Sequence, residues 1–132
     1  MCSSQNEIEQ NKDGSESSVL ESKDSLLKFK AGYKKLKIIL SGSNEFIIGR
    51  GDRCNIRLDK MISVEGISRE HAMIIKTTAE DGQIAYQIKD MGSAYGTYVN
   101  GQKIGGDYRL LNHRDEIKFG QYVIFVFKQG LS

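Results

Sequence analysis

The sequence predicts an all-β protein, a β-sandwich that follows a disordered N-terminal tail. From residue 29 onward, short apolar or alternating runs rich in β-branched and aromatic residues are separated by Gly, Asn and Asp turn signals. No segment shows an extended helical period bounded by caps, so we expect helix only as single turns. With 132 residues and no internal repeat, the chain has room for one domain with a moderate core.

The first 28 residues differ in composition from the rest of the chain. They hold seven serines and six acidic residues against three lysines, and their apolar residues are isolated. Such a segment buries too little apolar surface to offset the entropy lost on ordering. We therefore expect a disordered acidic, Ser-rich tail over residues 1–28 and a folded domain over residues 29–132.

Eight runs after the tail have the pattern of strands, and turn signals separate them. They span residues 36–40, 45–48, 55–58, 72–76, 84–89, 96–99, 116–119 and 122–127. Asn100-Gly101 is the strongest hairpin signal, because both residues tolerate positive φ in a two-residue turn. The last run is apolar on both faces, which suits a central strand, since an exposed edge of this kind would invite aggregation.

The loop over residues 59–66 contains three apolar side chains between predicted strands. These are Met61, Ile62 and Val64. They could form an apolar ledge on the surface, but apolar side chains of this size are usually buried. We expect at least one of them to pack in the core.

Charge and cysteine content narrow the class of function. The net charge of +2 divides into −3 for residues 1–28 and +5 for the remainder. This bias suits an anionic ligand but does not indicate nucleic acid, which requires a clustered basic face, and ordinary surface scatter is the plainer interpretation. Cys2 and Cys54 match neither a zinc spacing nor a disulfide framework, so we expect no metal and no cofactor.

Targeting signals are missing from the sequence given. No apolar run is long enough to cross a bilayer, and the polar start lacks the basic and apolar regions of a signal peptide. The sequence therefore predicts an intracellular protein, nuclear or cytoplasmic, that does not act at a membrane.

Arg50 is the first candidate binding residue. It follows Gly49 at the end of an apolar run, which places a guanidinium group at the mouth of the sheet. The guanidinium fork can donate two charge-assisted hydrogen bonds to phosphate oxygens, and Gly49 permits either the close approach of another backbone or a φ that a side chain forbids. Taken alone, however, a surface arginine paired with Asp52 is the simpler interpretation.

Ser68 and His71 raise the question of nucleophilic catalysis. A hydrolase would need His71 at the serine hydroxyl, an orienting carboxylate and oxyanion donors nearby. The sequence shows no strand-turn-helix elbow around Ser68. A Ser68 hydroxyl that donates to phosphate, with His71 holding its own loop, needs fewer assumptions, and a small hydrolase stays open as a remote alternative.

Taken together, these segments resemble the forkhead-associated (FHA) domain family. The motifs are Gly49-Arg50, Ser68-Arg69-Glu70-His71 and the stretch of residues 90–101, in this order, and the similarity runs from about residue 34 to residue 128. The resemblance implies an eleven-stranded β-sandwich of two antiparallel-type sheets. It also implies a non-catalytic protein-protein interaction module that binds phosphothreonine peptides in kinase signalling.

The resemblance also assigns roles to individual residues. Arg50 and Ser68 would hold the phosphate, and Arg69 would line the peptide groove. The residues that shape the loops would be Gly49, His71, Gly96 and Asn100. The expected partner is a threonine-phosphorylated protein or peptide.

One pair of residues departs from the family pattern. Where the family most often has Thr-Asn before Gly96, this chain has Ala94-Tyr95. Loss of the asparagine amide removes about 1 kcal/mol of peptide binding, which Tyr95 partly replaces by stacking or through its hydroxyl. The alternative interpretation is a phosphate-independent binding or structural domain with a decayed site.

Self-association through a phosphorylated threonine is disfavoured by the positions of the threonines. The chain contains only Thr77, Thr78 and Thr97, all in or next to predicted strands. The acidic tail contains none, so we expect a monomer.

Overall fold

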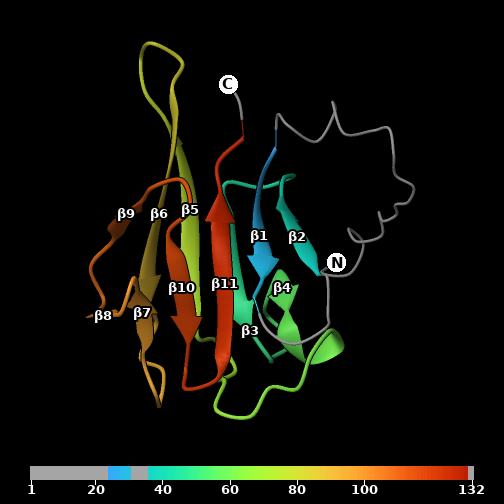
Figure 1. Ribbon diagram of the computed structural model, residues 1–132. Coiled ribbons are helices and arrows are strands. Elements are labelled where there is room, and N and C mark those ends of the chain that lie inside the picture. Colours follow the sequence, from blue (N-terminus) through green and yellow to red (C-terminus); the bar gives the residue numbers. More distant parts are fainter. Residues whose placement is uncertain (1–23, 31–35, 131–132) are drawn as a thin grey trace.

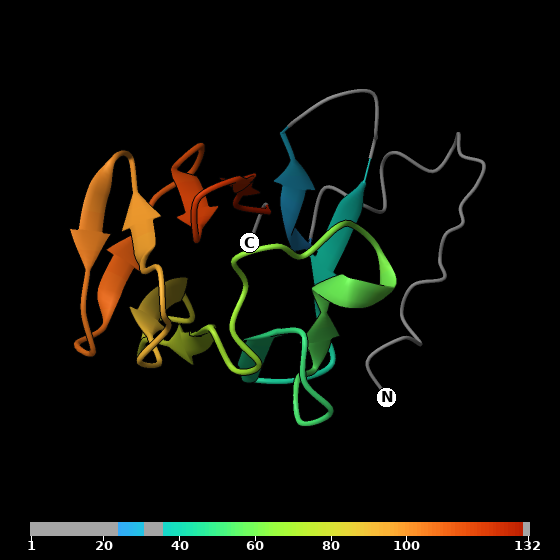
Figure 2. The same cartoon turned by 90° about the horizontal axis from the view of Figure 1, so that it is seen from below.

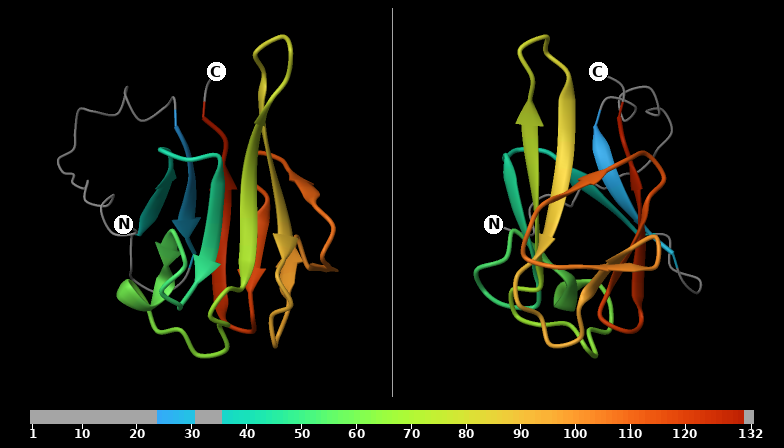
Figure 3. Two further views of the ribbon diagram at one scale, coloured as in Figure 1. Left: turned by 180° about the vertical axis from the view of Figure 1, so that it is seen from behind. Right: turned by 90° about the vertical axis from the view of Figure 1, so that its left-hand side faces the viewer.

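Two β-sheets packed face to face make up the structure, a computed structural model that describes residues 24–30 and 36–130 (Figure 1). The views in Figure 3 show the two layers from behind and from the side. Within the described residues, helix is confined to one 3-10 turn, Leu58–Lys60, and none is long and apolar enough to cross a membrane. The predicted all-β sandwich is confirmed.

The six-stranded sheet has the order β2-β1-β11-β10-β7-β8, and the five-stranded sheet has the order β4-β3-β5-β6-β9. The first sheet contains β1 (Ser25–Phe29), β2 (Lys37–Leu40), β7 (Thr97–Val99), β8 (Gln102–Ile104), β10 (Glu116–Phe119) and β11 (Val123–Lys128). The second contains β3 (Glu45–Gly49), β4 (Ile56–Arg57), β5 (Ala72–Thr78), β6 (Ile84–Asp90) and β9 (Arg109–Leu111). The paired strands are antiparallel except β3 and β4, which run parallel.

Strand β1 corrects the predicted boundary between tail and domain. Residues 25–28 were expected to belong to the disordered tail, yet Ser25–Phe29 pairs with β2 on one side and β11 on the other. Leu27 is fully buried, because the two neighbouring strands bring it to the inner face of the sheet. The predicted disorder of residues 1–23 lies outside the described residues.

Strands β8 and β9 were also missed by the sequence analysis. Each has only three residues, and β8 has two polar residues followed by one buried isoleucine. Runs this short carry too little alternation to be recognised, and their pairing with β7 and β6 makes them strands. Each of the eight predicted runs corresponds to a strand whose ends lie within two residues of the expected ones.

Three local predictions are confirmed by the structure. Asn100 and Gly101 have φ of 52° and 85° and form the β7–β8 turn. Strand β11 lies between β1 and β10, and its alternate side chains are buried in the core. In the loop of residues 59–66, all three apolar side chains pack against the core.

Candidate functional site

Three loops gather at one end of the sandwich, the lower end in Figure 1, which Figure 2 views directly. They are residues 50–55 after β3, residues 61–71 before β5, and residues 91–96 between β6 and β7. All of the predicted phosphate and groove residues lie on these loops.

Gly49 lets the first two loops approach each other closely. A Cβ atom at this position would lie 2.1 Å from the backbone oxygen of Arg69, so no side chain fits. Beyond it, the Arg50 N–H donates to the Ser68 oxygen at 3.3 Å, and the Gly51 N–H donates to the Arg69 oxygen at 3.0 Å. The Cys54 thiol donates to the same Arg69 oxygen at 2.9 Å. These contacts fix the backbone that carries Arg50 against the backbone that carries Ser68.

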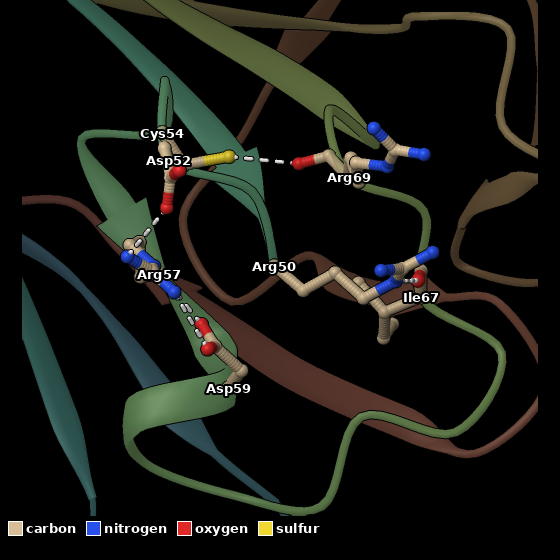
Figure 4. Close-up of polar contacts among 7 residues, drawn as sticks. All are labelled: Arg50, Asp52, Cys54, Arg57, Asp59, Ile67 and Arg69. Carbon is tan, nitrogen blue, oxygen red and sulfur yellow. Dashed lines mark hydrogen bonds and ion pairs between the residues drawn. The ribbon is translucent and has the colours of Figure 1, made fainter.

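The Arg50 side chain lies along the second loop (Figure 4). Its Nε donates to the Ile67 oxygen at 2.7 Å, and the residue is exposed. The simpler interpretation, an ion pair with Asp52, is wrong, because Asp52 instead contacts Arg57 at 3.1 Å. No carboxylate in the described part of the chain pairs with Arg50. Its terminal nitrogens are therefore available to an anion.

Ser68 connects the second loop to the third. Its Oγ accepts a hydrogen bond from the Ala94 N–H at 3.0 Å. Within the described residues, the hydroxyl proton of Ser68 has no acceptor, so this group can still donate one hydrogen bond to a ligand. Arg69, the next residue, is exposed and forms no ion pair within the described residues.

His71 is fully buried and joins the same two loops from beneath. Its Nδ1 accepts from the Ser68 N–H at 3.1 Å, and its Nε2 donates to the Gly96 oxygen at 2.8 Å. Burial lowers the pKa of His71, although the Gly96 carbonyl and the Asp90 carboxylate oppose this shift. The imidazole is therefore neutral, with its proton on Nε2.

This arrangement bears on the hydrolase alternative. Both ring nitrogens of His71 bind backbone groups, and Nδ1 contacts the amide of Ser68 rather than its hydroxyl. A general base must reach the proton that it removes. The Ser-His catalytic arrangement is thus absent from the described residues, which also contain no cluster of His, Cys, Asp or Glu that could hold a metal ion.

The third loop is organised by Asp90, to which the sequence analysis assigned no role. Its carboxylate accepts from the N–H groups of Gly92 and Ser93, both at 2.9 Å, and from the hydroxyls of Ser93 at 2.6 Å and Thr97 at 2.7 Å. Burial disfavours the charged form, but these four hydrogen bonds outweigh it and lower the pKa of Asp90. An Asp two residues before a Gly is a local turn signal that would have identified it.

Ala94 and Tyr95 lie exposed at the tip of the third loop. Ala94 contributes its backbone N–H to Ser68, as described above. Tyr95 is 51% exposed, and its ring lies beside Gly66 of the second loop, with Cδ2 3.8 Å from the position of a Cβ there. Tyr95 therefore presents an aromatic face next to the phosphate-binding candidates.

Two of the predicted loop-shaping residues, Gly96 and Asn100, lie at opposite ends of β7. Gly96 has φ of 88°, which favours glycine, and its oxygen accepts from His71 and from the Gly120 N–H at 2.8 Å. Asn100 lies at the opposite end of β7, where its Nδ2 donates to Asp115 at 2.9 Å and its Oδ1 accepts from the Glu116 N–H at 2.9 Å. Asn100 thus organises the β7–β8 turn and not the three loops.

The fold and the loops define a class of protein, a β-sandwich that presents cationic and hydroxyl groups from loops at one end. Residues 46–120 match the FHA domain family, and the chain belongs to it. Other FHA domains of known structure make phosphothreonine-dependent interactions or are in complex with phosphothreonine peptides. No curated protein matches the chain.

Solved structures of other FHA domains are similar to this chain. The yeast Dun1 FHA domain, solved with a doubly phosphorylated peptide derived from Rad53, has a TM-score of 0.67 and 26% identity, covering 89% of this chain and 79% of that one. The FHA domain of CT664 from Chlamydia trachomatis has a TM-score of 0.65 and 27% identity, covering 82% and 99%. The MEK1 FHA domain, solved with a phosphothreonine peptide of HOP1, has a TM-score of 0.64 and 24% identity, covering 81% and 97%, and shows the fold alone.

Proposed function

We propose that this chain is a phosphothreonine-dependent peptide-binding module that recruits a threonine-phosphorylated protein in kinase signalling. The observation that carries the proposal is the position and the hydrogen bonding of the Arg50 side chain. Its guanidinium is anchored through Nε to the Ile67 oxygen, it has no carboxylate partner within the described residues, and it contacts the neighbouring loop, which carries Ser68. The module acts inside the cell, in the nucleus or cytoplasm, as a monomer and without catalysis.

Preorganisation explains how so few groups could bind a peptide. The Nε hydrogen bond to Ile67 restricts the Arg50 side chain before a ligand arrives, so less rotamer entropy is lost on binding. The terminal nitrogens can then donate to a phosphate that carries a charge of about −1.5 to −2. The Ser68 hydroxyl adds a further donor.

The flanking peptide contacts fall to the neighbouring loops. Arg69 and Tyr95 are both exposed beside the phosphate-binding pair, one on the second loop and one on the third. An extended peptide that crosses these loops buries little area, so a micromolar Kd, roughly −8 kcal/mol, is expected. The phosphate anchor supplies the dependence on phosphorylation, and the two side chains supply the sequence preference.

The decisive experiment measures peptide binding by fluorescence anisotropy for wild type, Arg50→Ala and Arg109→Ala. Peptides from one oriented library are presented with phosphothreonine, phosphoserine or threonine at the fixed position. We expect wild type and Arg109→Ala to select phosphothreonine. Arg50→Ala should lose at least tenfold in affinity, about 1.4 kcal/mol, because a charged donor pair is removed.

Thermal unfolding of the same three proteins provides the control for folding. Arg50 is exposed and its side chain makes one hydrogen bond within the described residues, so its removal should leave the melting temperature nearly unchanged. Equal capture of phosphorylated and plain peptides by wild type would refute the proposal and favour a phosphate-independent module. An unfolded Arg50→Ala variant would make Arg50 a structural residue.

A further inference from the structure

The outer face of the six-stranded sheet is basic, and Figure 1 looks onto it. Side chains alternate along a strand, so residues next to buried core positions such as Leu27, Ile117 and Phe127 point outward. Six lysines occupy outward positions on β1, β2, β8, β10 and β11 or directly after β1. They are Lys28, Lys30, Lys37, Lys103, Lys118 and Lys128, and together they define the basic face.

Little within the sheet compensates this charge. Glu116 is the one acidic residue on the face among the described strands, and it forms an ion pair with Lys30. Lys118 lies over the ring of Tyr98, with Nζ 4.7 Å from the ring centre. Lys28 and Lys37 are direct cross-strand partners, an arrangement of like charges that is destabilising unless an anion lies between them.

The basic face accounts for all of the net positive charge of the described residues. It carries a net charge of +5, whereas the other described residues hold nine basic and eleven acidic side chains. The sequence shows these lysines scattered over a hundred positions. Only the pairing of β1 with β11 and of β10 with β7 gathers them on one surface.

The complementary charge is present in the same chain. Residues 1–23 hold five acidic residues against two lysines, and they lead directly into β1, which is part of the basic sheet. At about 3.3 Å per residue, 23 residues reach across the whole sheet. Covalent attachment also gives an effective concentration of about 1 mM or higher, so weak contacts suffice.

We propose that the acidic segment of residues 1–23 docks on the basic face, which is formed by the strands of the six-stranded sheet, and not on the three binding loops. Lysine ammonium groups are point charges without the bidentate geometry of arginine, so they suit several registers of a carboxylate-rich segment. The contact is electrostatic and therefore weakens with salt, because the Debye length falls from about 8 Å at 0.15 M to about 3 Å at 1 M. It is independent of the phosphopeptide site.

The test uses the full chain with a nitroxide coupled to Cys2, a residue of the acidic segment, because Cys54 is buried. Paramagnetic broadening of backbone amides is compared at Lys118 and Lys103, on the basic face, and at Met73 and Lys89, on the opposite sheet. We expect broadening at the first pair and little at the second in low salt. The difference should disappear in 1 M NaCl.

Three variants of the full chain separate charge from simple tethering. The first neutralises the segment by changing Glu7, Glu9, Asp13, Glu16 and Glu21 to Gln or Asn. The second changes Lys28, Lys118 and Lys128 to Gln, and the matched control changes Lys60, Lys76 and Lys89 to Gln. The first two variants should lose the selective broadening, and the control should retain it.

Two results would overturn the proposal. One is equal broadening of both sheets, or broadening that survives neutralisation of the segment, since either would indicate a tethered chain without a docking site. The other result comes from binding of phosphatidylserine vesicles and of duplex DNA to the full chain. A docked acidic segment competes with these anions for the basic face, so neutralising the segment should strengthen their binding. If their binding stays unchanged, the face belongs to an external partner.

Discussion

At the residue scale, the missing side chain of Gly49 holds the candidate site together. The backbone of Arg69 occupies the space where a Cβ would lie, which brings the loops of Arg50 and Ser68 into direct hydrogen bonding. The sequence left two interpretations of Gly49 open, a close backbone approach and a φ that a side chain forbids. It could not name the partner, because Arg69 is twenty residues away along the chain.

Gly49→Ala should therefore damage both stability and binding. The new methyl group would meet a backbone oxygen at 2.1 Å, which must move, and overpacking of this kind costs about 1–3 kcal/mol. Urea unfolding and phosphopeptide titration measure the two effects. Gly106→Ala is the matched control, because nothing lies within 4 Å of its Cβ position. A Gly49→Ala variant as stable as this control would contradict the packing argument.

At the element scale, we expect the β7–β8 hairpin to contribute to stability and not to peptide binding. Asn100 holds the turn through both atoms of its amide, and it lies at the end of β7 away from Gly96. Family resemblance placed Asn100 among the loop-shaping residues. The pairing of β7 with β10 assigns it instead to the turn that contacts Asp115.

Asn100→Gly should lower the free energy of unfolding by about 1–3 kcal/mol while leaving phosphopeptide affinity unchanged. Glycine keeps the positive φ but removes the amide, which leaves the buried Asp115 carboxylate with one donor fewer. Chemical unfolding and anisotropy titration of the same sample check both parts. A drop in affinity of the folded variant would show that the hairpin shapes the binding loops after all.

At the scale of the whole molecule, stability should depend on pH through His71. Burial lowers the pKa of His71 below its ordinary value of 6.5, so the unfolded chain binds a proton at a higher pH than the folded one. Stability should therefore fall as the pH drops below about 6.5 and level off below the folded pKa, with a slope of at most about 1.4 kcal/mol per pH unit. Asp90, with a lowered pKa, should act only in a more acidic window, where stability is lost as the pH falls through its folded value.

Urea unfolding between pH 7.5 and 5 measures this dependence. His71→Gln should be less stable at neutral pH, because a buried ring and its two hydrogen bonds are lost, but its stability should change little in this range. His113→Gln is the matched control, because it removes the other histidine of the chain, which lies on an exposed turn. An unchanged slope in His71→Gln would assign the pH dependence to other groups.

Local patterns in the sequence were sufficient for the fold class, for most strands and for the candidate phosphate residues. Period-two alternation reports which face of a strand is buried, and Asn100-Gly101 specifies its turn by backbone preference alone. Arg50, Ser68 and His71 stand out because their residue types and neighbours carry the chemistry. None of these inferences requires knowledge of a distant contact.

Only the tertiary structure decided the features that depend on residues far apart in the chain. Strand β1 exists because β2 and β11 cover both of its edges, and a five-residue segment cannot supply those hydrogen bonds itself. The neutral state of His71 and the free donors of Arg50 follow from loops that meet across 17 to 25 residues of the chain. The basic face arises in the same way, because strand order, and not sequence order, determines which charges are neighbours.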